Sequence, residues 1–365
     1  MVPGVNRKQS SHLDGMDFLN VFKSCMWLKY LGKSLMVAIV GSLVFMANYS
    51  VWSQALVPGI RYGKQLPAAD SVKPHVGGQM WYIAVACVYA GSVGMLLWCY
   101  IRTMADCPGR VPESWFPFPP EEFSEEEYNL LRHDDAFRQD MLNRYSKELE
   151  EYSAEVLDDG RKGRAQVAYL YATRPRWCKK CRKWKPPRSH HCSMQNACIL
   201  KMDHYCVWMT NTIGALNYKS FVLFLAWTCL ACLLSAALLF QSCIMFVTAP
   251  ATLGRMDVIT SIVSFMSFVC TAAFTLALIG FLIMHGNLIR KNMTTIEAYE
   301  KETIDPWPHD RGSWKENIRE VLGRGPWYRY VIPQLTEKER KVLLEHSSCL
   351  KHKVSRRHLL HHGIV

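Results

Sequence analysis

Four long apolar stretches of this 365-residue chain contain no Asp, Glu, Lys or Arg. They cover residues 35–57, 80–101, 221–247 and 258–289, and each reaches the roughly 20 residues that an α-helix needs to cross a bilayer. A buried helix of a soluble domain seldom runs that far without a charge. The missing charge therefore argues against a soluble globular protein and predicts an α-helical polytopic membrane protein with four transmembrane helices.

Three further features are missing. The first 33 residues contain no short apolar core followed by a small-residue cleavage site, so we expect no cleaved signal peptide. The four stretches lack the paired intramembrane charges of an ion path, which argues against a channel or transporter. No nucleic-acid motif accompanies the net charge of +12, so we interpret this charge as basic loops that face anionic lipid headgroups.

Basic residues predict the orientation. The N-terminal segment, the long middle segment and the C-terminal tail hold most Lys and Arg, whereas the loop between the third and fourth stretches has only Arg255. Because basic loops stay in the cytosol, all three segments are predicted to be cytosolic, although Arg61, Lys64 and Lys73 in the first loop mildly oppose this. The expected organisation is a cytosolic N-terminus (1–33), transmembrane helices 1 and 2 (34–101), a linker (102–173), a cysteine-rich domain (174–220), transmembrane helices 3 and 4 (221–289) and a basic tail with a T-T-x-E motif (290–365).

The linker contains one clear helix signal. Ser124 and Glu127 form the S-x-x-E pattern of a capping box, and apolar residues follow at spacings of three and four up to about residue 157. We therefore expect one amphipathic helix, which either lies on its own domain or binds a partner. No internal repeat is recognised in the chain.

Five of the 14 cysteines lie between residues 178 and 206, and in a reducing compartment such a cluster is typical of metal binding or catalysis. Cys178 and Cys181 form a C-x-x-C knuckle, with His191 and Cys198 downstream. Three thiolates and one imidazole suit a closed structural zinc site. Scattered free thiols are the alternative.

Asp203, His204 and Cys206 supply the three parts of an activated thiol. An imidazole takes the proton of the thiol, and a carboxylate orients the imidazole. Adjacent residues seldom form such a triad by regular secondary structure alone, so we expect the zinc site upstream to bend the backbone. These residues alone leave catalysis and a structural His/Cys pair equally open. The thiol lies about 15 residues before the third span, which suits a substrate with a lipid chain.

The chain resembles the DHHC protein S-acyltransferases, or palmitoyltransferases. The resemblance covers most of the chain and includes "CKKCRKWKPPRSHHCSMQNACILKMDHYCVWMTNTIGALNYKSFVLF", with the catalytic motif in a DHYC variant. Asp106-Cys107-Pro108-Gly109 looks like the family's D-P-G element with one residue inserted. Thr294, Thr295 and Glu297 match the T-T-x-E motif, and Asn317 matches the C-terminal motif.

The resemblance implies a two-step transfer. Cys206 attacks a long-chain acyl-CoA and becomes a thioester, and a cysteine of a membrane-associated protein then takes the acyl group. His204 would be the general base and Asp203 its orienting group, with a T-T-x-E threonine nearby. Lys185 and Arg188 match basic positions expected to meet the CoA phosphates, with an ordinary solvated or lipid-facing charge as the alternative. The expected location is the Golgi, the endoplasmic reticulum or the plasma membrane, and the need for an accessory subunit stays open.

The sequence departs from the family pattern at a second zinc site. This site would use Cys192 and positions 195, 205 and 212, but these positions hold Gln195, Tyr205 and Thr212. We therefore predict one structural zinc per chain and a packed or hydrogen-bonded cluster in place of the second. Val207 replaces a usual proline after the cysteine, which puts some rigidity of that loop in doubt. An active enzyme is the main hypothesis, and a catalytically weak membrane scaffold or chaperone is the alternative.

Overall fold

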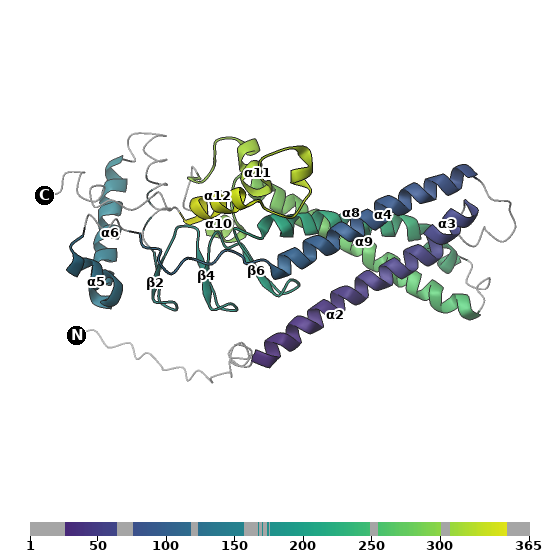
Figure 1. Cartoon of the computed structure of the whole chain (residues 1–365), viewed down its shortest axis with the longest axis horizontal. Helices are drawn as coiled ribbons and strands as arrows, with labels where there is room; N and C mark the ends of the chain where they lie inside the picture. Colours follow the sequence, from purple (N-terminus) through teal and green to yellow (C-terminus); the bar gives the residue numbers. More distant parts are fainter. Residues whose placement is uncertain are drawn as a thin grey trace, which may run out of the picture.

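The computed structural model describes residues 26–63, 76–117, 123–156, 167, 170, 174, 176–248, 255–300 and 307–348. Its longest elements are helices that form a bundle (Figure 1). They are α2 (Met26–Val51), which continues through a π-helical turn (Trp52–Leu56) into α3 (Val57–Tyr62), and then α4 (Val76–Ala105), α8 (Tyr218–Thr248) and α9 (Arg255–Arg290).

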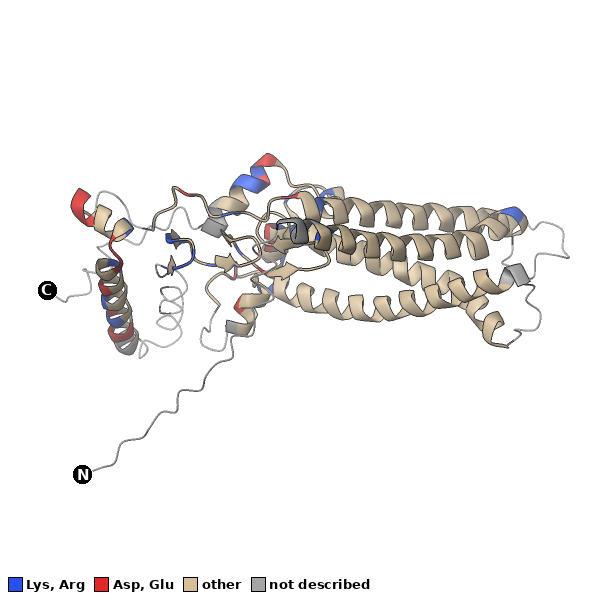
Figure 2. Ribbon diagram, turned by 90° about the horizontal axis from the view of Figure 1, so that it is seen from below, with Lys and Arg blue, Asp and Glu red and all other residues tan. Residues whose placement is uncertain are grey.

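Four helical segments of the bundle are long and apolar enough to span a membrane: Leu31–Tyr62, Gly77–Ala105, Tyr218–Thr248 and Val258–Arg290. Figure 2 shows that the charged residues gather beyond one end of the bundle, while the walls of the helices are almost free of them. The four spans predicted from uncharged stretches are therefore confirmed, with helices several residues longer than the stretches themselves.

The cysteine-rich segment between α4 and α8 folds into three antiparallel hairpins. They pair β1 (Arg176–Cys178) with β2 (Lys183–Lys185), β3 (His190–Cys192) with β4 (Ala197–Ile199), and β5 (His204–Cys206) with β6 (Asn211–Ile213). Each hairpin begins 14 residues after the previous one. The expectation of no internal repeat was therefore wrong, because a unit this short is visible only once its strands are paired.

The three hairpins share one turn geometry. Four residues separate the strands in each, and the last of the four is Arg182, Asn196 or Thr210, with φ of 49°, 47° and 48°. This left-handed conformation is uncommon for residues other than glycine. The cysteine that ends the first strand is Cys178, Cys192 or Cys206 in turn, so the three thiols occupy equivalent positions.

The linker helix is divided, which corrects the expectation of a single helix. Ser124 caps α5 (Glu125–His133), and its capping box with Glu127 is present. At Asp134 the backbone becomes extended, and the Asp134 carboxylate accepts hydrogen bonds from the backbone N–H groups of Ala136 and Phe137 at 2.8 and 2.9 Å. Asp134 therefore begins a second helix, α6 (Asp135–Val156), as a side-chain cap.

The segment after the fourth span folds back over the hairpins and the end of the bundle (Figure 1). It contains α10 (Thr295–Glu300), α11 (Trp314–Leu322), a 3₁₀ turn (Trp327–Tyr330) and α12 (Glu337–Ser348). The Asn317 amide donates to the carbonyl of Arg290 at 2.7 Å and to Asp310 Oδ1 at 2.9 Å, and its oxygen accepts from the backbone of Arg311 at 3.0 Å. Asn317 thus fixes α11 to the end of α9.

Candidate active site and metal centre

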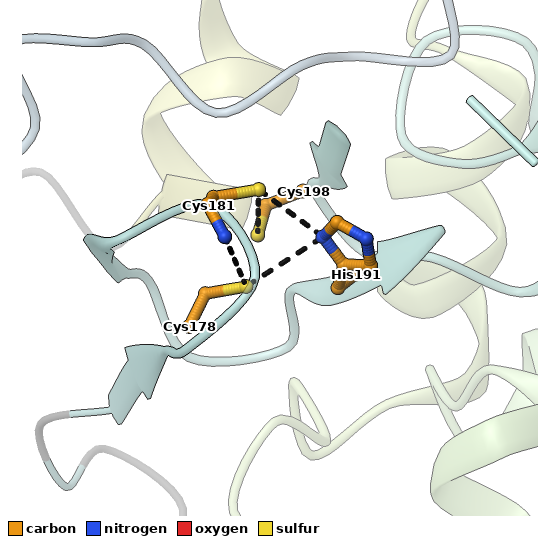
Figure 3. Close-up of side chains that lie close together, drawn as sticks. All are labelled: Cys178, Cys181, His191 and Cys198. Carbon is orange, nitrogen blue, oxygen red and sulfur yellow. Dashed lines mark hydrogen bonds between the residues drawn. The ribbon is translucent and has the colours of Figure 1, made fainter. Parts of the chain in front are cut away.

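Cys178, Cys181, His191 and Cys198 converge between the first two hairpins, with their ligand atoms all within 4.8 Å of one another (Figure 3). His191 Nδ1 lies 3.1 Å from the Cys181 sulfur and 3.6 Å from the Cys178 sulfur, and the Cys181 and Cys198 sulfurs lie 3.7 Å apart. For zinc–sulfur bonds of about 2.3 Å, a tetrahedron has edges of about 3.8 Å. The donor set and its spacing therefore fit a structural zinc ion.

The corresponding positions between the second and third hairpins are Cys192, Gln195, Tyr205 and Thr212, each 14 residues further along the chain. The Thr212 hydroxyl donates to the Cys192 sulfur at 3.0 Å, and the Gln195 amide donates to Asn211 Oδ1 at 2.5 Å. Tyr205 pairs with Thr212 across the strands and packs against the buried group around Cys192. These side chains, held together by hydrogen bonds and van der Waals contacts, fill the place where a second ligand set would lie.

The triad candidates lie at the start of the third hairpin. His204 and Cys206 are two residues apart in β5, so they project from the same face of the strand. His204 Nδ1 donates to Asp203 Oδ2 at 2.7 Å. Strand alternation alone therefore places His204 and Cys206 on one face, whereas Asp203, the third member of the expected triad, precedes the strand.

Asp203 is held from a distant part of the chain. The backbone N–H of Thr295 donates to Asp203 Oδ1 at 2.7 Å, and the Thr295 hydroxyl donates to Oδ2 at 3.0 Å. Asp203 is only 1% exposed. Burial alone would raise its pKa, but its hydrogen bonds with His204 and Thr295 outweigh burial and lower the pKa. Asp203 therefore stays ionised.

The electrostatics favour a charged imidazole. Burial lowers the pKa of His204, but hydrogen bonds to Asp203 and Cys206 outweigh burial and raise the pKa to about 9. At neutral pH the arrangement therefore supports an imidazolium beside the thiol. Such a partner stabilises the thiolate, which is the reactive form of cysteine.

Aromatic residues from the third and fourth spans support His204, and the sequence did not single them out. The Phe221 ring meets His204 edge to face at 5.2 Å and His285 at 5.3 Å. A hydrogen bond of 3.0 Å joins the Tyr218 hydroxyl to His285 Nδ1. A lone histidine in an uncharged span was the available signal, because an ionisable residue at that depth commonly marks a functional site.

Arg188 is not exposed to solvent. Its guanidinium forms a two-pronged ion pair with Glu297 at 2.6 and 2.8 Å and donates to the Asn292 carbonyl at 2.8 Å. Both side chains are 5% exposed. Burial raises the pKa of Glu297, but Arg188 outweighs it and lowers that pKa to about 2. Glu297 of the T-T-x-E element thus binds the cysteine-rich segment, while the Thr294 hydroxyl accepts a hydrogen bond from the backbone N–H of Glu297 at 3.2 Å.

A second ion pair extends this buried network. Lys201 donates to Glu320 of α11 at 2.9 Å and to the Asn292 amide oxygen at 2.7 Å. Lys201 and Glu320 are 7% and 8% exposed. The network joins the hairpins to the segment after the fourth span, and so holds Thr295 against Asp203.

Lys185 lies in a different setting. It pairs across the first hairpin with Arg176, and both lie close enough to His190 to lower its pKa, after burial, to about 4. His190 Nε2 is buried without a hydrogen-bond partner among the described residues. Arg176 and Lys185 therefore place two cations close together beside the buried imidazole of His190.

The structure thus combines helices long enough to span a membrane, a zinc-type ligand set and a hydrogen-bonded Asp203–His204 pair on the strand of Cys206. This combination is the one expected of a membrane enzyme with a reactive thiol. Residues 172–302 match the model of the family described as DHHC palmitoyltransferase. The chain is 36% identical over 328 residues to "Probable protein S-acyltransferase 13" of Arabidopsis thaliana, an alignment that covers 89% of this chain and 92% of the relative. It is 33% identical over 255 residues to "Palmitoyltransferase ZDHHC20-A" of Danio rerio, an alignment that covers 68% of this chain and 64% of the relative. The chain belongs to the DHHC family of protein S-acyltransferases.

Proposed function

We propose that the chain transfers a long-chain acyl group from acyl-CoA to a cysteine of a membrane-associated protein, through a thioester on Cys206. Family membership supports the reaction class. The observation that carries the assignment of residues is the hydrogen bond of His204 to a buried, ionised Asp203, with Cys206 two residues further along the same strand face.

In the first step, the Cys206 thiolate attacks the carbonyl carbon of the acyl-CoA thioester. The tetrahedral intermediate collapses, the bond from the carbonyl carbon to the CoA sulfur breaks, and the acyl group remains on Cys206. The His204 imidazolium gives its proton to the departing CoA thiolate. Asp203 keeps the imidazole oriented throughout through its contact with Nδ1.

In the second step, neutral His204 takes the proton of the incoming protein thiol. That thiolate attacks the Cys206 thioester, the new thioester forms on the substrate, and Cys206 leaves as a thiolate beside the imidazolium. The two steps return every group to its starting state. The position of Cys206 near the start of α8 supports a substrate thiol presented at the membrane surface.

The cofactor is one structural zinc ion on Cys178, Cys181, His191 and Cys198. When bound, zinc would supply a fixed link between the first two hairpins. The third hairpin carries the chemistry and is held instead by Thr212, Gln195 and Asn211, whose amide donates to the carbonyls of Thr103 and Asp106 at 2.9 and 3.0 Å.

The CoA phosphates would meet Lys185 rather than Arg188. Arg188 donates hydrogen bonds to Glu297 and to the Asn292 carbonyl, which supports a structural role for Arg188. Arg176, the cross-strand neighbour of Lys185, would supply the second cation of this anion-binding pair. The N-terminus, the hairpins and the C-terminal segment are assigned to the cytosol, in endomembranes or the plasma membrane.

Autoacylation of the purified full-length protein tests this function. A clickable palmitoyl-CoA analogue should leave a hydroxylamine-sensitive label on the wild type. Cys206→Ser should abolish the label and His204→Ala should reduce it, whereas Cys107→Ser, which removes an exposed thiol elsewhere, should have no effect. A folded, zinc-loaded wild type without label would contradict the proposal and favour the scaffold alternative.

A further inference from the structure

A partly open pocket of about 240 Å³ lies where the fourth span ends. One wall consists of Asn287 and Arg290 near the end of α9, followed by Lys291. The opposite wall consists of Asp310, Ser313 and Trp314, at the start of α11. This helix packs against the end of α9 (Figure 1). The pocket plays no part in the acyl transfer described above.

The two cations of this pocket have no partner among the residues that the structure describes. Arg290 and Lys291 are exposed, and neither side chain forms an ion pair or hydrogen bond within the part of the chain that the structure describes. The neighbouring cations Arg188 and Lys201 are, in contrast, buried in ion pairs with Glu297 and Glu320. The pocket thus presents two available positive charges in one place.

The residues of the opposite wall limit the chemical class of ligand that can bind. Asp310 Oδ1 already accepts from the backbone of Gly312 at 2.9 Å and from Asn317 at 2.9 Å, and its carboxylate leaves the lining with one net positive charge. A ligand with one negative charge and several hydroxyl groups matches this lining, because its hydroxyls meet Asp310, Ser313 and Asn287. A phosphodiester next to a polyol has this composition.

The depth of the pocket points to the bilayer. Arg290 is the first charged residue after the uncharged stretch 258–289 and ends a helix long enough to span a membrane, and the headgroup region begins where such an apolar stretch ends. Trp314 is 54% exposed, and tryptophan is enriched at the membrane interface. Basic pockets at this level bind anionic headgroups.

We propose that this pocket binds the phosphodiester headgroup of an anionic, hydroxyl-bearing phospholipid of the phosphatidylinositol type. Arg290 and Lys291 contact the phosphate, Asp310 and Ser313 contact hydroxyl groups, and Trp314 lies against the glycerol region. Its lining residues include neither Arg176 nor Lys185, the pair assigned to the CoA phosphates. Its occupancy fixes α11, and with it the buried network, to the membrane surface.

The test measures binding to the full-length protein in detergent. Short-chain phosphatidylinositol is titrated against wild type, Arg290→Gln/Lys291→Gln and the double variant Arg144→Gln/Lys147→Gln, whose two cations are exposed side chains of α6. We expect at least a tenfold loss of affinity in the first variant, no loss in the second, and recovery in Arg290→Lys/Lys291→Arg. Equal binding by wild type and Arg290→Gln/Lys291→Gln, or equal binding of short-chain phosphatidylcholine, would overturn the proposal.

Three further ligands identify the source of the phosphate. Soluble glycerophosphoinositol and inorganic phosphate should bind weakly, because they lack the acyl chains that the membrane level implies. Saturation by either at the affinity of the lipid would overturn the lipid assignment in favour of a soluble phosphate. Displacement of the lipid by free CoA would contradict the proposal that the lipid and CoA bind at different sites. Cys206→Ser should bind the lipid like wild type, which keeps this result independent of catalysis.

Discussion

Asp203→Asn tests the electrostatic role assigned to Asp203. The amide is nearly the same size and keeps an oxygen for the Thr295 N–H, but it removes the charge that stabilises the His204 imidazolium. The pKa of His204 rises from 6.5 to about 9 as the net effect of burial, which lowers it, and of Asp203 and Cys206, which raise it with Asp203 first; this shift corresponds to about 3 kcal/mol in favour of the charged ring. Allowing for the third of the side chain that solvent reaches, about 2 kcal/mol remains.

This free energy predicts the loss of rate. At 1.36 kcal/mol for each factor of ten, about 2 kcal/mol corresponds to a roughly 30-fold slower step. We expect the single-turnover rate of autoacylation at pH 7.4 to fall by about that factor in Asp203→Asn. Asp140→Asn, an exposed carboxylate in an ion pair on α6, should match wild type. A rate within threefold of wild type, in a variant with normal zinc content and melting temperature, would refute the reasoning.

Three shorter predictions concern the metal, the buried network and pH. Elemental analysis should find one zinc per chain in the wild type and none in Cys198→Ser. Two tightly bound zinc ions per wild-type chain would contradict the single-site assignment. Arg188→Gln should cost about 3–5 kcal/mol because it leaves Glu297 buried without its partner; adding Glu297→Gln should restore part of the melting temperature, and no recovery would argue against the pair. Because the pKa of His204 is raised when folded, its stabilising contribution is complete below pH 6.5 and disappears as pH rises through about 9. The difference in melting temperature between wild type and His204→Gln should therefore shrink between pH 6 and pH 9.5, and a growing difference would contradict the assignment.

The sequence predicts best where a local pattern has one physical meaning. Uncharged stretches long enough to cross a bilayer gave all four spans, and the spacing of Cys178, Cys181, His191 and Cys198 gave a ligand set that meets in space. Both depend on residues close together in the chain or on composition alone.

What the sequence could not predict depends on contacts between distant segments. Arg188 looks like a surface cation until Glu297, 109 residues away, is placed against it. His285 and Phe221 come from different helices and meet only in the folded bundle. The division of the linker helix at Asp134 depends on nearby residues, but the sequence does not distinguish a capping aspartate from a solvated one in the middle of a charged helix. Only the structure shows that the Asp134 carboxylate caps the next helix.

The 14-residue spacing of the hairpins places Cys206, the proposed nucleophile, at a position equivalent to a zinc ligand. A complete ligand set takes two residues from one hairpin and two from the next, so three hairpins provide room for two metals and no more. Cys206 occupies in the third hairpin the position that Cys178 occupies in the first, but α8 begins where a fourth hairpin would have to stand. The thiol of Cys206 is thus a ligand position at the end of a series, left without the neighbours that would bind it to a metal. Because α8 follows in place of a fourth hairpin, no second ligand set forms around Cys206 among the described residues, and its thiol stays available for the proposed acyl transfer.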